Sequence, residues 1–426
     1  MKRLAALITE RGEMILSGEE QTPWAEYPRP DLVRESYHCL NGDWEFYVSR
    51  SEEADIDMKW ERIRVPFPPQ SILSGIHRDI PDGSYLWYRK TVQVPRDLAD
   101  QGNGSHEASV NGERLILHID AADQITDVYV DGTHVGTHEG GYSRASFDIT
   151  DAVAKDPFEL IIRVFDKLED RVFPYGKQSL KRGGMWYTPV SGIWQSVWME
   201  TVPAEHVEKI KVSVSPLDGE RYKTVFDITG IDTGKLTVEM PDGENVSIEI
   251  ENGSAEMILE APRLWSPDAP YLYRFTVSAG GDFVRSYFAV RTINVRTIDG
   301  ISRICLNGEP VFFNGLLDQG YWSDGLMTPA SPSCFTDDIV KLKEIGFNTL
   351  RKHIKVEPDI FYYECDRLGM FVFQDMVNNG DYSFLRDTVI PTVGRLSRDD
   401  TKKLPSPEIM ERFKCAMLET AEHLEG

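Results

Sequence analysis

The segment NTLRKHIKVEP, at positions 348–358, concentrates basic residues in a chain whose formal net charge is −23. Arg351 and His353 are two apart in a strand-like run, and residues two apart in a strand face the same side. Arginine offers a rigid fork of donors and histidine both a donor and an acceptor, which suits hydroxyl or carboxylate groups of a ligand. The alternative is a salt-bridged strand end. Lys352 points to the other side, where we expect a solvated or structural role.

Two carboxylates follow neighbouring predicted strands. Asp375 ends the strand MFVFQDM. It is either a pocket carboxylate that orients a ligand hydroxyl or tunes a catalytic acid/base, or else a helix cap or an ion-pair partner of Arg351. Asp318 ends the earlier run VFFNGLLD. Since the carboxyl ends of parallel strands share one edge of a sheet, both are candidate binding residues with Arg351 and His353.

Composition narrows the class of ligand and partner. A pI near 4.8 argues against nucleic acid and anionic lipid, so an uncharged or weakly charged ligand fits better. No apolar stretch is long enough to span a membrane. The five cysteines form no CxxC pair, which argues against zinc and disulfide frameworks and favours a cytoplasmic location with reduced thiols. No metal or cofactor motif stands out, and we expect neither.

The first 295 residues predict two β-sandwiches. Runs such as WEFYV, RLILHI and ELIIRVF are rich in β-branched and aromatic residues, and no convincing amphipathic helix accompanies them. After a break near residues 202–210, seven short strands in about ninety residues are typical of an immunoglobulin-like sandwich.

From about residue 296 the pattern alternates between strands and helices. A strand at 311–317, a helix at 334–347 capped by Thr336, a strand at NTLRKHI, a helix at 357–369, a strand at 370–376 and a helix at 405–426 predict three parallel βα units. A flavodoxin-like doubly wound sheet is the alternative, but such a sheet usually has five strands and only three are predicted here.

Several of these runs, in order, resemble glycoside hydrolase family 2, which contains β-galactosidases, β-glucuronidases and β-mannosidases. The resemblance covers residues 23 to 426. The segment WYTPVSGIWQSVWME at 186–200 is the most specific match. The others are LNGDWEFYV, YLWYRKTVQVP, VYVDGTHVGTHEGGYSRASFDIT, LNGEPVFFNGLLDQG, FNTLRKHIKVEP and YYECDRLGMFVFQDM.

The resemblance implies a multidomain, mainly β protein. Its parts would be an N-terminal extension (1–22), a sugar-binding jelly-roll β-sandwich (23–201), an immunoglobulin-like β-sandwich (202–295) and the N-terminal portion of a (β/α)8 TIM barrel (296–426). The implied partner is a carbohydrate, a β-glycoside or an oligosaccharide. A homo-oligomer is conceivable, because the last parallel strand would leave an open edge.

The resemblance also implies a retaining glycosidase with two glutamates, one acting as acid/base and the other as nucleophile. In the family the acid/base glutamate follows an asparagine, yet none of the eleven asparagines here precedes a glutamate. Both glutamates are therefore expected beyond Gly426, and the chain alone is expected to be inactive. The segment GLLDQG at 315–320 also departs from the family's Arg-His-Glu-like run, which leaves the sugar open. The competing hypothesis is a non-catalytic carbohydrate-binding or scaffold protein.

Three aromatic residues are further candidates for the binding of a sugar. Trp322 could stack on the apolar face of a sugar ring or simply pack in its loop. Trp186 and Tyr187 lie in a loop that, by the resemblance, approaches the mouth of the barrel, with a structural role as the alternative.

Overall fold

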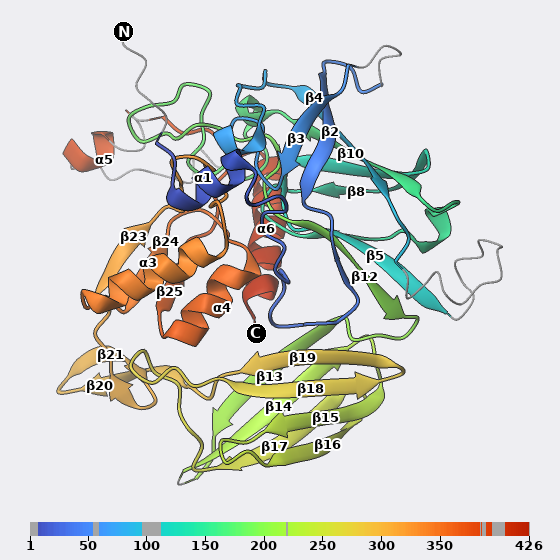
Figure 1. Cartoon of the computed structure of the whole chain (residues 1–426). Helices are drawn as coiled ribbons and strands as arrows, with labels where there is room; N and C mark the ends of the chain where they lie inside the picture. The colour runs from blue at the N-terminus through green and yellow to red at the C-terminus, as the bar shows by residue number, and fades with distance from the viewer. Residues whose placement is uncertain are drawn as a thin grey trace.

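The computed structural model of the chain describes residues 7–53, 59–95, 112–218, 220–383, 385, 389–393 and 405–425. Figure 1 shows three parts: antiparallel sheets at the upper right, a second β-rich part at the base, and parallel strands with their helices on the left. Strands outnumber helices, which confirms the predicted mainly β fold. The predicted domain boundaries stay predictions.

The first part consists of two antiparallel sheets that share one hydrophobic core. In β2 (Gly42–Ser49), Trp44 and Phe46 point into this core and Glu45 points outward, as the period of two in a strand requires. The larger sheet contains, in spatial order, β3 (Glu61–Val65), β2 (Gly42–Ser49), β4 (Ser84–Val92), β10 (Phe158–Asp166), β7 (Ile125–Val130) and β8 (Thr133–Glu139). The smaller contains β1 (Tyr37–Cys39), β12 (Val197–Pro203), β5 (Glu113–Ile119) and β9 (Ala145–Asp148), while β6 (Ala122–Asp123) pairs with β11 (Gly192–Ile193).

The second part contains the seven strands expected after the break, all with antiparallel neighbours around their own hydrophobic core. Their spatial order is β13 (Lys209–Pro216), β14 (Arg221–Thr229), β17 (Ser254–Glu260), β16 (Asn245–Glu251), β15 (Thr233–Glu239), β18 (Tyr273–Ala279) and β19 (Asp282–Phe288). Their assignment as an immunoglobulin-like fold stays a prediction.

The third part begins with an antiparallel sheet of β20 (Ile293–Ile298), β21 (Ile301–Leu306) and β22 (Glu309–Pro310). Three parallel strands follow, β23 (Gly315–Asp318), β24 (Thr349–Lys352) and β25 (Phe371–Gln374), joined by α3 (Ser333–Glu344) and α4 (Asp359–Leu368). The short α5 (Ile390–Val393) and the long α6 (Pro407–Leu424) come last. The parallel βα units are thus present, and their membership of a barrel stays a prediction.

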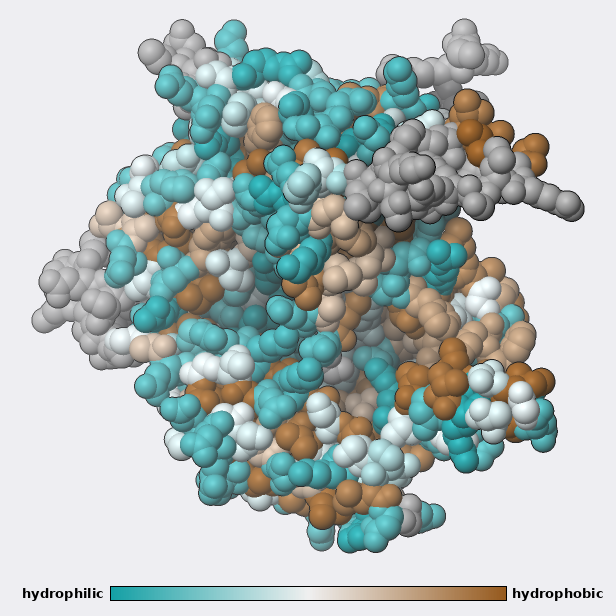
Figure 2. Space-filling view, turned by 180° about the vertical axis from the view of Figure 1, so that it is seen from behind, coloured by the Kyte–Doolittle hydropathy of each residue, from teal (hydrophilic) through white to brown (hydrophobic). Residues whose placement is uncertain are grey.

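Leu350 of β24 packs on α3 and α4 in one hydrophobic cluster, whereas the opposite face of the sheet is open. On that face Leu317 is 52% exposed and Phe373 44% exposed. Hydrophobic surface gathers on the right of Figure 2, the side to which this part turns when the molecule is seen from behind.

Two details of the predicted helices are wrong. The first half does contain a helix, α1 (Glu10–Ser17), capped by the Thr9 side chain; it buries little besides Ile15, so its apolar pattern is weak. Thr336 does not cap α3, because the helix begins earlier, at Ser333. At its start the Ser331 hydroxyl accepts a hydrogen bond from the Ser333 amide. The Thr336 hydroxyl instead donates to Glu364 of α4.

The predicted strand at 311–317 is also displaced. The paired strand is β23, and the residues before it lie outside the sheet. Phe313 packs edge-on against Phe371 and Phe373 of β25, with ring centroids 5.2 and 5.0 Å apart. The aromatic run therefore covers the lower part of the open face, which a period-two pattern alone does not distinguish from a strand.

A buried ion-pair hub joins the first two parts. Arg34 donates to both oxygens of Asp282 on β19, each at 2.8 Å, and to Glu200 of β12 at 3.0 Å. Glu200 also contacts Nε2 of His118 at 3.1 Å, and the imidazole stacks on Trp198 with centroids 4.0 Å apart.

The pH dependence of stability should report on this hub. Burial lowers the pKa of His118 to about 4. Between about pH 6.5 and pH 4 the unfolded chain binds a proton on this histidine and the folded chain does not. The histidine therefore contributes stability above about pH 6.5 that is lost as pH falls toward 4. His118→Gln should reduce the loss of urea resistance between pH 7 and pH 5. An equal loss in both proteins would contradict the assignment.

Candidate functional site

The register of the parallel sheet separates the predicted binding residues onto two faces. Arg351 lies opposite Leu317 and Phe373, whereas Lys352 lies opposite Asp318 and Gln374. Since side chains alternate along a strand, Arg351 belongs to the open face and Asp318 to the face that packs on the helices. The structure therefore does not bring Asp318 together with Arg351.

On the open side, Asp375 holds Arg351 and His353 together at the carboxyl edge of the sheet. Its Oδ1 accepts from Arg351 Nε at 3.0 Å, and its Oδ2 lies 2.8 Å from His353 Nδ1. Burial alone would raise the pKa of Asp375, but its bonds to Arg351 and His353 outweigh it and hold that pKa below its usual range. The expected ion pair exists, and a role in ligand binding stays a prediction.

Beneath this trio lies a buried cluster of charges. Lys352 Nζ donates to Asp318 Oδ2 at 2.6 Å and to Glu357 Oε1 at 2.7 Å. Lys355 Nζ donates to the same Glu357 oxygen at 2.8 Å and to the carbonyls of Gly320 and Met327 at 2.7 Å each. Lys352 is 1% exposed, so of its two expected roles the structural one is present.

Burial and charge act differently on the two lysines. Burial would lower the pKa of Lys352, but the carboxylates of Glu357 and Asp318 outweigh it and raise that pKa. Burial lowers the pKa of Lys355 to about 8, despite Glu357. The cluster fixes the turn after β24, and with it the position of His353. A Lys-x-x-Lys-x-Glu pattern at the end of a buried strand is the sequence signal that could have revealed it.

Aromatic residues of the first part reach the loops at this edge. The Tyr187 ring stacks on Tyr321, which follows β23, with centroids 4.0 Å apart and planes 11° apart. Trp186 meets Tyr382, in the loop after β25, edge-on at 5.4 Å. Both predicted aromatics therefore lie beside the carboxyl ends of the parallel strands. Sequence reasoning missed Tyr382, for which no local pattern gives a signal.

Trp322 takes a different position. Its ring packs edge-on against Phe335 of α3, with centroids 6.1 Å apart, at the margin of the cluster beneath the sheet. This is the packed arrangement expected as the alternative to a sugar platform.

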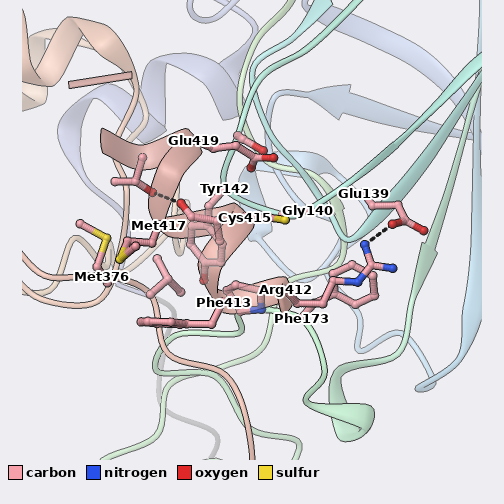
Figure 3. A pocket seen from close by; sticks show the side chains of 16 residues that line it. Glu139, Gly140, Tyr142, Phe173, Met376, Arg412, Phe413, Cys415, Met417 and Glu419 are labelled. Carbon is pink, nitrogen blue, oxygen red and sulfur yellow. Dashed lines mark hydrogen bonds and ion pairs between the residues drawn. The ribbon is translucent and has the colours of Figure 1, made fainter. Parts of the chain in front are cut away.

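Two cavities lie away from the predicted residues. A small one, of about 40 Å³, separates α6 from the turn after β8, where Arg412 pairs with Glu139 (Figure 3). A larger one, of about 410 Å³, lies between β13, β19, α4 and the end of α6. None of the seven predicted site residues lines either cavity.

The described ranges contain neither a metal-binding cluster nor a helix that could span a membrane. No three His, Cys, Asp or Glu side chains there converge as they would around a metal ion. No helix in the same ranges has the length and apolar character needed to cross a membrane.

Comparison with known proteins relates this architecture to glycosidases. The sequence model of the family Glycosyl hydrolases family 2 matches residues 195–291. A beta-galactosidase of Thermoanaerobacter pseudethanolicus is 27% identical over 310 residues, which are 68% of this chain and 39% of that protein. A beta-galactosidase of Bacteroides ovatus is 24% identical over 374 residues, 79% of this chain and 40% of that protein. The chain thus spans about two fifths of the length of these relatives.

A solved structure shows the same fold. The beta-glucuronidase of Ruminococcus gnavus superposes with a TM-score of 0.74 at 20% identity, covering 94% of this chain and 67% of that one.

Proposed function

Since this chain is a glycosyl hydrolase family 2-like protein, we propose that it forms the substrate-positioning half of a glycoside hydrolase that acts on β-glycosides. The single observation that carries the proposal is the trio at the carboxyl edge of the parallel sheet, where Asp375 holds Arg351 and His353. In barrel enzymes this edge bears the active site. The third part would then be the first three units of a (β/α)8 barrel.

In this proposal the residues of the chain bind and orient the sugar. Asp375 fixes the guanidinium of Arg351 and the imidazole of His353, whose remaining donors are suited to sugar hydroxyls or a carboxylate. The stacked rings of Tyr187 and Tyr321 form an aromatic wall nearby, to which the apolar face of a sugar can pack.

Bond cleavage would need two further carboxylates. A retaining glycosidase places them about 5–5.5 Å apart, one as nucleophile and one as acid/base. We propose that residues of the parent protein following Gly426 supply both, because no asparagine of the chain precedes a glutamate. The second candidate function, carbohydrate binding without catalysis, rests on the same absence.

A cytoplasmic location is part of the proposal and rests on the cysteines. The four described as buried or half-buried, and Cys415 on the surface, are all free thiols. Reduced thiols are usual in that compartment. A homo-oligomer built through the open edge of β25 is part of the same proposal.

The test compares this chain with the longer parent protein on chromogenic β-galactosides and β-glucuronides. Turnover is expected only from the longer protein, and an equal rate from the 426-residue chain would refute the assignment of the glutamates. In the longer protein, Asp375→Asn should weaken the binding of methyl β-glycosides roughly tenfold, because it removes the carboxylate that orients both donors.

Asp337→Asn is the matched control. Asp337 pairs with Arg11 on the surface of α3, and its loss should leave titration calorimetry of the same sugars unchanged. If both variants bind as the unmodified protein does, the trio is a structural ion pair and the proposed binding site is wrong.

A further inference from the structure

The segment from Gln178 to Ser191, which carries Trp186 and Tyr187, is tied at both ends to buried carboxyl groups. Gln178 Nε2 lies 3.4 Å from Asp123 Oδ2, and the Ser191 side chain is hydrogen-bonded to Asp166. Gln178 also accepts the Val190 amide at 2.6 Å. These contacts hold the two ends of the segment to the first part of the molecule.

The two carboxyl groups lie at the ends of strands from different sheets that meet in space. Asp123 ends β6 and Asp166 ends β10. The Gln124 amide donates to the Phe165 carbonyl at 3.1 Å, which places the strand end at Asp166 beside Asp123. Both side chains are buried, Asp123 at 1% and Asp166 at 5% exposure.

Each of these carboxyl groups has one oxygen without a partner. Oδ1 of Asp123 and Oδ1 of Asp166 make no hydrogen bond among the described residues. The first faces Gly141 so closely that a Cβ there would lie 2.6 Å from it. Two anions buried side by side without a basic partner would be strongly unfavourable, because burial and like charge both disfavour ionisation.

Among the described residues, no basic group is a leading influence on either carboxyl group. The titratable groups that act on the pair are Asp82 and the hydroxyls of Tyr88, Tyr142 and Tyr321. None of them is basic. Burial raises the pKa of Asp123 to about 7, and burial together with the charge of Asp123 raises the pKa of Asp166 well above its usual range.

The hydrogen bonds favour a proton over a metal ion. Gln178 presents its NH₂ group to Asp123. Ser191 Oγ accepts from Gln70 Nε2 at 2.9 Å, which leaves the hydroxyl proton for Asp166. Donors that point at carboxylates would repel a cation, whereas a cation would require converging acceptors. A carboxyl group that keeps its proton removes the repulsion without any further ligand.

We propose that Asp123 and Asp166 form a buried acid pair that keeps at least one proton at neutral pH and thereby positions the Trp186–Tyr187 segment at the candidate sugar site. They are positioning residues, which act on a sugar only through Gln178 and Ser191. The statement that the segment lies at a sugar site rests on the proposed function, whereas the acid pair itself does not. When the second carboxyl ionises, the repulsion should loosen the segment from both ends.

The sign of the pH effect follows from proton binding. Between about pH 4 and pH 7 the folded chain keeps a proton on Asp123 that the unfolded chain releases, so this group makes the folded state less stable as pH rises. The unfolding constant should grow by up to about tenfold per pH unit, the limit for one proton.

The test follows urea unfolding from pH 4.5 to 8.5 in the unmodified chain and in Asp123→Asn. His118 changes stability in the opposite sense over the same range, so the contribution of Asp123 is the difference between the two proteins. The variant should lack this decline between pH 4.5 and 7 and should be the more stable protein at pH 8. Asp127→Asn is the matched control, since Asp127 of β7 pairs with Arg163 and its pKa is lowered instead. That variant should keep the decline. The same decline in Asp123→Asn would overturn the proposal.

Amide hydrogen exchange measures the opening of the segment between Gln178 and Ser191 directly. After correction for intrinsic rates, protection of residues 179–190 should fall between pH 6 and pH 8.5 in the unmodified chain and stay constant in Asp123→Asn. Equal protection at both pH values in the unmodified chain would also overturn the proposal. If the variant does not fold, infrared spectroscopy of the unmodified chain at pH 7 should still show the band of a protonated carboxyl group. The absence of this band would refute the acid pair. A rise in the stability of the unmodified chain on adding Ca²⁺ would refute it as well. None of these readouts needs a sugar, so they fail independently of the proposed function.

Discussion

Glu357→Gln should destabilise the chain by about 3–5 kcal/mol, the usual cost of breaking a buried ion pair. One oxygen of Glu357 accepts from Lys352 and from Lys355, and the carboxylate is buried. Its removal would leave Lys355 with two backbone carbonyls and no counterion, while Lys352 would keep Asp318. Urea unfolding at pH 7, followed by circular dichroism, measures the loss.

Glu364→Gln is the matched control for this prediction. Glu364 is largely buried, but its partner Arg367 on α4 is 42% exposed and a glutamine can still accept from Thr336, so the loss should be clearly smaller than for Glu357. The double substitution Lys355→Met with Glu357→Leu should recover part of the lost stability, because it removes both charges instead of one. A Glu357→Gln protein as stable as the unmodified chain would show that the cluster does not support the turn after β24.

Arg34→Met should have a loss of similar size, about 3–5 kcal/mol, at the junction of the first two parts. The substitution removes the shared partner of Glu200 and Asp282, both of which stay buried. Glu200 keeps Arg29, whereas among the described residues Asp282 keeps the Val207 amide and no basic partner. The same urea unfolding experiment measures the loss.

Arg285→Met is the matched control for Arg34→Met. Arg285→Met removes a surface pair with Glu35 and should change the free energy of unfolding by less than about 1 kcal/mol. If Arg34 joins the two parts, the variant should also unfold in two steps when fluorescence and circular dichroism are compared. A single transition at the unmodified midpoint would contradict the role of the hub.

Much of the local structure follows from the sequence. Alternation in β2 places Trp44 and Phe46 inside, and Gly369 with its positive φ ends α4 where the sequence predicts. The same local rule predicts that Arg351 and His353 share a face; β24 ends at Lys352, and what the structure shows is that both side chains contact Asp375.

The errors share a physical cause, which is that burial depends on what covers an element. The sequence at 311–317 resembles one largely apolar strand, but only the residues from Gly315 onward pair with β24, and Phe313 packs on the open face of the sheet instead. Lys352 is charged, yet α4 covers it and Glu357 neutralises it, so its burial is not visible in the strand that carries it.

The sequence by itself therefore determined most strands and helices, because each depends on neighbours a few residues away. The tertiary structure decided which charges meet. Tyr187 stacks on Tyr321 across 134 positions, and Asp123 and Asp166 become neighbours through the register of β6, β7 and β10. Such contacts form because distant strands share a sheet or a core, and no short stretch of sequence encodes that proximity.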